Sequence, residues 1–448
     1  MVPIRTPSVS RIIVIVGFSL ALTACGDSSK LPDQSAIGSN PTLPEPNQTF
    51  IPTVHVAKAT GWPEGAKPTP PAGLAVNAFA TGLEHPRWLL VLPNGDVLVA
   101  ESNGPERPDD ARGVRGMVYK MAQKYAGAGV PSPNRITLLR DVDGDGVAET
   151  RKTFLTNLNS PFGMALVGED LYVANTDAVV RFAYKEGATE ITTPGTKLAD
   201  LPAGPLNHHW TKNIIASPDG ARLYATVGSN SNAAENGLDK EYQRAAILEI
   251  ERATGKTRVF ASGLRNPNGM AWQPQTGVLW TAVNERDELG SDLVPDYLTS
   301  VKDGGFYGWP FSYWGHHLDS RVPRNPALEA KAIVPDYALG NHTASLGLTF
   351  SSGTLLPEQL RNGAFIGQHG SWNRKPFSGY KVIFVPFVDG KPSGPPVDVL
   401  TGFIDANNKS LGRPVGVAID RAGALLVADD VGNTIWRVAP TAQTATRR

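Results

Sequence analysis

The stretch Leu83–Ala100 reads LEHPRWLLVLPNGDVLVA: a polar loop with a proline, an apolar strand, a Gly-containing turn and a second apolar strand. The same phrase recurs along the chain. Clear copies are Leu158–Ala174 (LNSPFGMALVGEDLYVA), Leu264–Ala282 (LRNPNGMAWQPQTGVLWTA) and Leu411–Ala428 (LGRPVGVAIDRAGALLVA), while Leu206–Thr226 is a variant and Ser345–Gly367 a weak copy with a longer insert. A repeated strand–turn–strand unit is the sequence signature of a β-propeller. These copies, six in all, predict an all-β, six-bladed propeller whose opening loops gather on one face around the central channel.

The composition is that of an ordinary globular chain. Of the 448 residues, 41% are hydrophobic and 19% charged, and the high counts of Gly (46) and Pro (37) favour many turns over long helices. Lys+Arg and Asp+Glu both number 42, so no overall basic field suggests nucleic acid as a partner. Tandem repeats explain the length better than several separate domains.

The N-terminus has the pattern of a lipoprotein signal. Arg5 and Arg11 frame the start of the apolar run Ile12–Leu22, which is short for a membrane span. The following tetrapeptide, LTAC, ends at Cys25 and resembles the bacterial lipobox. This resemblance implies that residues 1–24 are removed and that Cys25 is lipidated. The alternative is an ordinary secretory signal with an incidental cysteine.

The residues that follow Cys25 and the distribution of polar residues suggest a propeller domain held on a lipid anchor. Gly26, not Asp, follows the cysteine, which favours the outer over the inner membrane, so we expect a lipid-anchored protein on the periplasmic side of the envelope. With a single cysteine, the chain has no internal disulfide and no C-x-x-C-H haem site. Residues 25–73 are rich in Pro, Ser, Asn and Thr and are predicted to be a tether. Residues 74–438 would form the propeller and 439–448 a polar tail.

Two opening loops carry side chains suited to chemistry. The segment Gly263–Ala271 (GLRNPNGMA) presents Arg265 beside Asn266, a pair that suits an anionic or carbonyl-rich planar ligand. The alternative is that Arg265 pairs with a neighbouring blade. The segment Asn207–Lys212 (NHHWTK) holds two adjacent histidines, of which at most one is expected to face the channel and act as a base near neutral pH.

A third region combines acidic and aromatic residues. Trp280–Gly290 (WTAVNERDELG) is followed by Asp303–Pro310 (DGGFYGWP). The acidic loop could offer oxygen atoms to a hard cation such as calcium. The alternative is a solvated acidic loop followed by an aromatic core cluster.

Together these motifs resemble the sorbosone/soluble glucose dehydrogenase family, most closely its sorbosone branch. The residues that carry the resemblance are GLRNPNGMAW, NHHWTKN with SPDGARLYATVGS, NERDELG with GGFYGWP, and GRPVGVA. The resemblance runs from about Leu74 to Val438. Family members are six-bladed propellers that bind pyrroloquinoline quinone (PQQ) and calcium. The resemblance therefore implies oxidation of a sugar or aldehyde, with electrons passed to an external acceptor such as a quinone or a cytochrome.

The resemblance also implies roles for individual positions. His209 matches the catalytic base, which takes a proton from a sugar hydroxyl or aldehyde hydrate while a hydride passes to the quinone. The implied cofactor-binding residues are Arg265, Asn266, Arg413 and Arg374, with Lys375 in reserve for Arg374. Backbone oxygens near Arg286 and Asp287 match the calcium-binding stretch. Arg265 and this calcium would polarise the reacting carbonyl.

Three positions depart from the family pattern. His208 falls where the family often has Asp, and Asp96 falls where the glucose branch has a Gln near the reacting centre. Either could orient His209 through its second ring nitrogen. Leu411 replaces an arginine of the glucose branch, which leaves open whether PQQ is retained.

A separate calcium signal lies at Asp141–Glu149 (DVDGDGVAE). Asp141, Asp143 and Asp145 occupy positions one, three and five, glycines permit the turn, and Glu149 falls at position nine. We expect a structural calcium here, distinct from any catalytic one. The alternative is an Asx-turn without an ion.

Two other functions fit parts of the sequence. A calcium-dependent propeller hydrolase, such as a lactonase, would use calcium in the channel but would not need arginines on several blades. A non-catalytic binding propeller would keep the scaffold and lose the cofactor. The identity of the sugar, the electron acceptor and the oligomeric state are not encoded in any motif.

Overall fold

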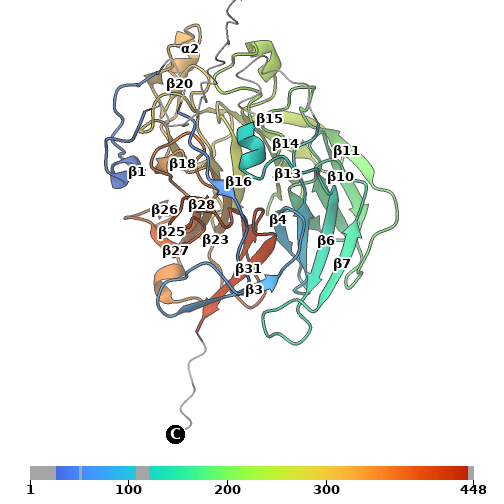
Figure 1. The fold of residues 1–448 in the computed structure, drawn as a ribbon. Coiled ribbons are helices and arrows are strands. Elements are labelled where there is room, and N and C mark those ends of the chain that lie inside the picture. The colour runs from blue at the N-terminus through green and yellow to red at the C-terminus, as the bar shows by residue number, and fades with distance from the viewer. Residues whose placement is uncertain (1–26, 50–52, 107–120, 442–448) are drawn as a thin grey trace, which may run out of the picture.

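The computed structural model describes residues 27–49, 53–106 and 121–441. Within these ranges the strands form six small sheets arranged as the blades of a propeller (Figure 1). The prediction of an all-β, six-bladed propeller is confirmed. Each copy of the repeated phrase supplies the first two strands of one blade.

The strands follow one another through the blades in chain order. Blade I has β4 (Pro86–Val91), β5 (Val97–Glu101), β6 (Arg135–Arg140) and β7 (Thr150–Leu155). Blade II has β8 (Met164–Val167), β9 (Asp170–Ala174), β10 (Ala178–Ala183) and β11 (Thr196–Asp200). Blade III has β12 (Ile214–Ala216), β13 (Arg222–Val227), β14 (Ala246–Glu251), β15 (Thr257–Ser262) and the parallel edge strand β19 (Gly305–Phe306).

Blade IV has β16 (Pro267–Trp272), β17 (Leu279–Val283), β18 (Pro295–Ser300) and β22 (Tyr337–Asn341). Blade V has β23 (Ser345–Phe350), β24 (Gly363–Gln368), β25 (Lys381–Val388), β26 (Lys391–Pro392) and β27 (Val397–Leu400). Blade VI has β29 (Pro414–Ile419), β30 (Leu425–Asp429), β31 (Thr434–Pro440) and β3 (Leu74–Ala80).

The first strand of each blade lines the centre. Strands β4, β8, β12, β16, β23 and β29 contact one another in a closed circle. The second strand of a blade is covered by both neighbouring sheets, and every residue of β5, β17, β24 and β30 is buried. Each buried Val or Leu side chain stabilises the fold by roughly 1.5–3 kcal/mol. This double burial explains why the second strand of the phrase reads L-Y-V-A, with no polar alternation.

The ring is closed by the two ends of the propeller. Strand β3 forms the outer edge of blade VI and pairs antiparallel with β31, with Val76 opposite Val438. An N-terminal strand thus completes the sheet that the C-terminal strands begin. Strand β31 runs on to Pro440, so the first residues of the predicted polar tail belong to the sheet.

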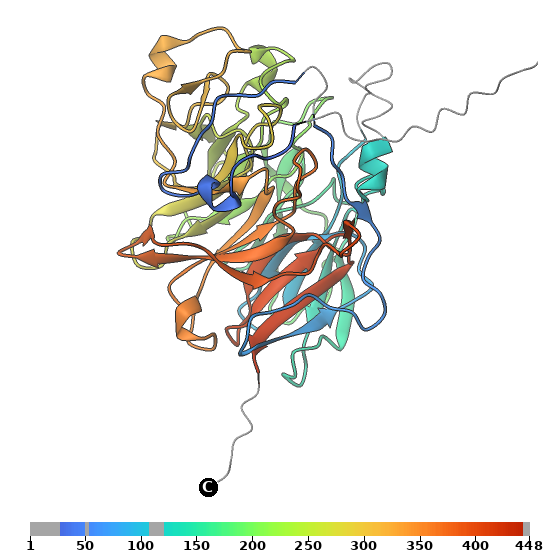
Figure 2. The same ribbon diagram turned by 60° about the vertical axis from the view of Figure 1, so that its left-hand side comes forward.

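An N-terminal segment, here called the arm (residues 27–49 and 53–73), lies on the propeller instead of extending away from it. Its β1 (Ile37–Gly38) pairs with β22, and its β2 (Lys58–Ala59) pairs with β28 (Lys409–Ser410). Figure 2 shows the arm in blue along the outside of the blades. The tether prediction is therefore wrong for these residues. The arm docks through backbone and polar groups, which leave no apolar pattern in the sequence.

Short elements decorate the blades, and none of the described helices is suited to crossing a membrane. They are the 3-10 helices η1 (Asp33–Ala36), η2 (Leu238–Glu241) and η3 (Glu358–Leu360), the helix α2 (Pro326–Glu329), and the hairpin of β20 (Ser312–Tyr313) with β21 (His317–Leu318). Among the described residues, no helix has both the length and the apolar character for a membrane span. The predicted signal peptide and Cys25 lie outside the described residues.

Candidate active site

His209 lies in the loop that leads into β12, at the loop-bearing face of blade III. Its Nδ1 is 2.7 Å from the carbonyl oxygen of Ser229. Because a carbonyl oxygen only accepts hydrogen bonds, Nδ1 carries the hydrogen and Nε2 keeps its lone pair. Burial, aided by the charge of Arg265, lowers the pKa of His209 well below 6.5. The ring is therefore a neutral base at neutral pH.

Asn266 lies beside His209, as the predicted site requires. A Cβ atom at position 228 would collide with both Asn266 Oδ1 and the Cβ of His209, so Gly228 is needed for this close approach. The Oδ1 atom of Asn266 is buried and has no hydrogen-bond partner among the described residues. Buried polar atoms are almost always paired, so this oxygen is available to a ligand or a water molecule.

Arg265 is held in place by groups from two blades. Its Nη1 donates to the carbonyl oxygen of Glu285 at 2.5 Å, and its Nη2 donates to Asn232 at 3.0 Å and to the carboxylate of Asp287 at 3.2 Å. Asn232 belongs to blade III, so the alternative of a contact with a neighbouring blade holds in part. The Nε atom of Arg265 is buried and has no partner in the described part of the chain.

The acidic loop after β17 is buried, not solvated. Asp287 accepts hydrogen bonds from Asn373 at 2.6 Å and from Arg265. Burial alone would raise the pKa of Asp287, but the charge of Arg265 and contact with His342 lower it to about 2. The side chain of Arg286 turns away and pairs with Asp319 at 2.7 Å.

The glycine–aromatic run that follows packs as the alternative expected. Tyr307 belongs to a buried apolar cluster, and Trp309 is buried with its Nε1 donating to the carbonyl oxygen of Asn232 at 2.9 Å. The run therefore packs in the core next to the acidic loop, whose Leu289 belongs to the same apolar cluster as Tyr307.

A second histidine cluster was not among the predicted site residues. His369 follows β24, and its Nε2 lies 2.9 Å from Asp430 Oδ2, just after β30. Arg87 pairs with the same carboxylate, and His85 lies 3.7 Å from it. Burial lowers the pKa of His369 to about 4 despite the opposing effect of Asp430. Burial would raise the pKa of Asp430, but these cationic and hydrogen-bonding neighbours hold it below its ordinary value.

The geometry fixes the tautomer of His369. Since Asp430 is ionised, Nε2 must donate the hydrogen, and Nδ1 keeps the lone pair. The side chain of His369 is 17% exposed, whereas that of Asp430 is 2% exposed. His369 is thus a neutral base that a buried carboxylate orients. One signal was available in the sequence: His85 and Arg87 stand in the opening loop of the first repeat, the loop class predicted to carry function.

Arg413 stands next to this cluster, at the start of β29. Its Nη2 donates to the Tyr380 hydroxyl at 2.9 Å, and its guanidinium lies 5.2 Å from the Tyr380 ring centre. Its backbone nitrogen donates to Asp429 at 2.8 Å. Like Arg265 and Arg87, it has a buried Nε without a partner among the described residues.

Contacts link these groups into one site at the loop-bearing face. Arg87 of blade I lies 5.8 Å from the ring centre of Trp210, the neighbour of His209. Asp287 connects Arg265 with Asn373 of blade V. The carbonyl oxygen of Arg413 in blade VI accepts from the Asp430 backbone at 3.4 Å. The structure thus brings His209, Arg265, Asn266, Asp287 and Arg413 into one network, together with the residues that sequence reasoning missed.

Other predicted residues lie elsewhere. All three guanidinium nitrogens of Arg374 donate to the arm or to neighbouring loop carbonyls, and Lys375 is exposed. Asp96 lies in the β4–β5 turn, at the opposite end of the hairpin from His85, and pairs with Arg140 at 2.6 Å. Asp96 therefore does not orient His209, because a hairpin turn and an opening loop belong to opposite faces. The carbonyl oxygen of Ser229 orients His209 instead.

The predicted calcium turn gathers its carboxylates but stands apart from the histidines. Ligand atoms of Asp141, Asp143, Asp145 and Glu149 all lie within 4.8 Å of one another. The turn joins β6 to β7 at the face opposite the opening loops. Ala148 and Gly146 bond to β3, at the closure of the ring. An ion here would fasten blade I to blade VI.

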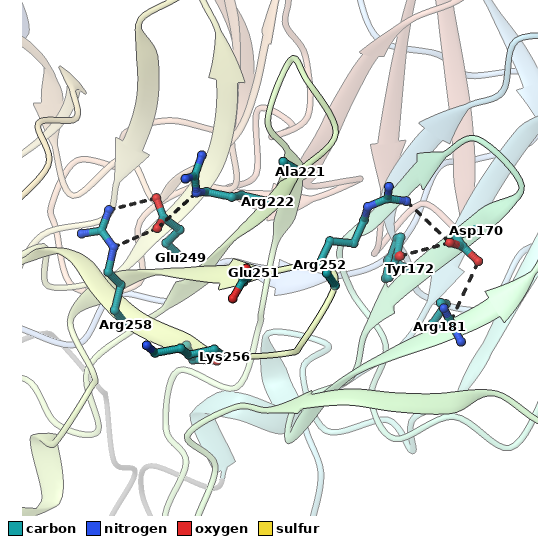
Figure 3. Close-up of a pocket in the computed structure, with 12 residues that line it drawn as sticks. Asp170, Tyr172, Arg181, Ala221, Arg222, Glu249, Glu251, Arg252, Lys256 and Arg258 are labelled. Carbon is teal, nitrogen blue, oxygen red and sulfur yellow. Dashed lines mark hydrogen bonds and ion pairs between the residues drawn. The ribbon is translucent and has the colours of Figure 1, made fainter.

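A cleft of about 610 Å³ also lies at that opposite face, between blades II and III (Figure 3). Its cationic side chains are partly offset by carboxylates. Arg258 pairs with Glu249 at 2.8 Å, and Arg252 lies 3.5 Å from Asp170. The cleft is at the far ends of the strands from His209, about 15–20 Å away along a six-residue strand. It plays no part in the site built above.

Two parts of the chain match known protein families. Residues 165–370 match the Glucose / Sorbosone dehydrogenase family, and residues 325–441 match the TrAA12-like family. The resemblance inferred from the motifs is confirmed. Over residues 165–370 the chain is therefore similar to glucose/sorbosone dehydrogenases.

Individual relatives of the glucose/sorbosone dehydrogenase region are distant. The aldose sugar dehydrogenase YliI of Escherichia coli is 22% identical over 313 residues, which cover 66% of this chain and 78% of that protein. The holo form of the pyranose dehydrogenase PQQ domain from Coprinopsis cinerea has a TM-score of 0.65 at 20% identity, covering 86% of this chain and 100% of that one. A calcium structure of a Trichoderma reesei family AA12 enzyme has a TM-score of 0.66 at 18% identity, covering 87% and 99%.

Proposed function

We propose that the protein is a PQQ-dependent dehydrogenase that oxidises a hydroxyl or hydrated aldehyde group of a sugar. One observation carries the proposal. Arg87, Arg265 and Arg413, from three blades, are buried at one face, and each leaves its Nε without a partner among the described residues. Arg87 and Arg413 lie near His369, and Arg265 lies near His209. Guanidinium groups pair well with carboxylates, so this set suits a planar ligand with several carboxylates, such as PQQ.

The residues present fit this cofactor. Besides the arginines, Asn266 offers a buried oxygen near His209 that no described residue contacts by a hydrogen bond. Leu411 removes one arginine expected in the glucose branch, but Arg87 supplies a further cation close to Arg413. Both arginines act on the same ring, since each lowers the pKa of His369. We therefore infer that the departure at Leu411 is compatible with retention of PQQ.

A histidine of the chain would accept the proton that the oxidation releases. Oxidation of a C–OH group removes a proton from the oxygen and a hydride from the carbon. His369 Nδ1 holds a lone pair that can take the proton, and ionised Asp430 would stabilise the resulting imidazolium. PQQ, when bound, supplies the quinone that accepts the hydride. His209 Nε2 offers a second lone pair, but its other nitrogen faces the neutral carbonyl and hydroxyl groups of Ser229. His369 is therefore our first choice of base.

Calcium is proposed for the turn at Asp141–Glu149, where four carboxylates converge. The stretch around Arg286 and Asp287 fits calcium less well. The carboxylate of Asp287 already holds Arg265 and Asn373, and its carbonyl oxygen accepts from Asn232 at 3.0 Å. A cation there would meet the guanidinium of Arg265.

The hydrolase alternative has less support. A lactonase-like enzyme would need metal-binding side chains in the channel. Within the described residues, the one His, Cys, Asp and Glu group that could hold a metal is the turn at 141–149, at the opposite face. A binding propeller that has lost the cofactor would not bind PQQ, which separates it from the proposed dehydrogenase.

The test uses the full chain, purified without cofactor. PQQ is titrated in the presence of calcium, and dye reduction is followed with glucose, sorbosone and a panel of aldoses. The proposal expects saturable PQQ binding and activity only with PQQ. Absence of PQQ binding would refute it, and lactone hydrolysis without PQQ would favour the hydrolase.

We also propose that electrons pass to an external acceptor, a quinone or a cytochrome, and that Cys25 anchors the protein at the periplasmic side of the outer membrane. The Asp27 carboxylate accepts from the Ser291 backbone at 2.8 Å. Asp27, the first described residue, is thus fixed at the face of the opening loops. Labelling with a radioactive fatty acid, lost in Cys25→Ser, tests the anchor.

A further inference from the structure

We propose that Arg374 is a positioning residue, not a ligand of the cofactor: it locks the arm onto the two loops that carry Asp287 and Asn373 and so preorganises the proposed site. The proposal rests on the proposed function for the identity of the ligand. The link that Arg374 makes between the arm and the two loops, here called the brace, is argued from contacts within the chain alone. It assigns the arm a part in the site that its composition does not suggest.

Arg374 differs from the three other arginines of the site. Its Nε donates to Ser291 O at 3.0 Å, its Nη1 to Pro376 O at 3.2 Å, and its Nη2 to Asp33 at 2.7 Å and Ser29 at 3.0 Å. Every guanidinium nitrogen is thus engaged, and the side chain is 2% exposed. Four of its five N–H groups are used, so Arg374 cannot offer a cofactor carboxylate the paired N–H groups of a bidentate contact.

The arm grips the first loop, residues 284–292, at several points. Asp292 accepts hydrogen bonds from Ser29 Oγ at 2.5 Å and from the Lys30 backbone at 2.7 Å. The backbone of Asn47 donates to Leu289 O at 2.9 Å. Gly290 has a φ of +100°, a backbone conformation that costs a side chain energy, and arm residues pack against it. The loop is thus fixed from outside at a residue with a positive φ.

The arm grips the second loop, residues 371–377, in the same way. The Ser29 backbone donates to Lys375 O at 2.7 Å, and the His55 backbone donates to Trp372 O at 2.8 Å. The His55 ring stacks on Phe377 with centroids 3.8 Å apart. These contacts come from parts of the arm on both sides of residues 50–52, so the loop is held along its length.

A short path leads from the arm to the site. Asn373, the neighbour of Arg374, donates to Asp287 at 2.6 Å, and Asp287 in turn holds Arg265. Binding is stronger when the receiving groups are already fixed, because less ordering remains to be done on association. A brace that fixes both loops therefore strengthens ligand binding without touching the ligand.

The ion pair between Asp33 and Arg374 allows an opposite interpretation. If Asp33 competed with a cofactor carboxylate for Arg374, the arm would be inhibitory. The two interpretations predict opposite effects of Asp33→Ala on the affinity for PQQ. Removal of a competitor strengthens PQQ binding, whereas removal of a brace weakens it. Asp33 is 61% exposed, so its replacement should not prevent folding.

The test is a double-mutant cycle in the full chain with Asp33→Ala, Arg374→Met and the double variant. Arg374→Lys is added because it keeps the charge but not the three-nitrogen geometry. Asp398→Ala is the matched control, since it removes an exposed carboxylate paired with Lys381 at 2.7 Å. The first readout is amide hydrogen exchange without any ligand, and the second is the Kd for PQQ with calcium.

We expect exchange at residues 284–292 and 371–377 to rise at least tenfold in Asp33→Ala and Arg374→Met, with no change in β5 or β30. The Kd for PQQ should rise about tenfold in Asp33→Ala and Arg374→Met. For Arg374→Lys it should lie between the values of the wild type and Arg374→Met. The double variant should bind PQQ no more weakly than Arg374→Met. Unchanged exchange in both loops, or a rise spread over the whole propeller, overturns the brace. Tighter PQQ binding in Asp33→Ala also overturns it. If the wild type does not bind PQQ, the proposed function fails while the exchange data still decide the brace.

Discussion

The Nε2 atom of His369 lies 2.9 Å from Asp430 Oδ2, and this carboxylate also pairs with Arg87. Three blades contribute to this one contact: His369 comes from blade V, Asp430 from blade VI and Arg87 from blade I. Burial would raise the pKa of Asp430, but His369, His85 and Arg87 hold it below its ordinary value. The charged carboxylate therefore orients the histidine and supports its protonated form. Among the described residues His209 has no equivalent carboxylate at Nδ1, which faces the carbonyl and hydroxyl oxygens of Ser229.

This difference predicts which histidine is the base. His369→Asn should lower kcat by about 10²–10⁴-fold, the range for loss of a general base. Asp430→Asn should lower kcat less, because the base remains but loses its orienting charge. His209→Asn is the matched comparison. If His209→Asn abolishes turnover while His369→Asn stays within a few-fold of the wild type, the base is His209. Steady-state kinetics with PQQ-loaded enzyme measure all three.

The same contact predicts the pH profile. Burial lowers the pKa of His369 to about 4, so the ring is already neutral at pH 5 and above. We expect kcat/KM, which reports the free enzyme, to be flat from about pH 5 to neutrality and to fall only in stronger acid. A histidine with its ordinary pKa of about 6.5 would instead halve the rate near that pH. An acid limb near pH 6.5 in a protein still folded by circular dichroism would contradict this assignment.

The fold was predictable because one structural unit repeats. The inner hairpin of each blade is buried on both sides, and the same demand for apolar residues acts at Val97–Glu101 and at Leu425–Asp429. The opening loops could be assigned to one face for the same reason. Arg265 was found in a clear copy of the repeat, and His209 was found at the same place in a variant copy.

The misses have physical causes as well. His369 and Asp430 follow the second strand of their blades, outside the opening loops on which the prediction concentrated, and no local sequence relates them across two blades. Asp96 was aligned by position, but a hairpin turn places it at the far face. The arm was missed because its partners are carboxylates and backbone groups such as those at Asp292, which require no hydrophobic periodicity.

Asp287 predicts a specific acid sensitivity. Its pKa is lowered to about 2 in the fold, against an ordinary value of 3.8, so protons bind the unfolded chain first. The stabilisation is present above pH 4 and is lost as the pH falls toward 2, a loss of about 2 kcal/mol. Urea unfolding of the wild type and of Asp287→Asn between pH 5 and pH 2 should show the gap in unfolding free energy closing. The exposed Asp398→Asn is the control, and a gap that does not change with pH would disprove the assignment.

The turn at Asp141–Glu149 predicts a structural calcium that is separate from catalysis. Its four carboxylates repel one another without a cation, and the turn bonds to β3, where the ring closes. Calcium at a hundredfold excess over its Kd should stabilise the fold by about 2.7 kcal/mol. Asp143→Asn together with Asp145→Asn should remove this gain in thermal unfolding and leave PQQ affinity unchanged. Asp405→Asn, at another exposed acidic turn, is the control. An undiminished calcium effect in the double variant would show that the ion binds elsewhere.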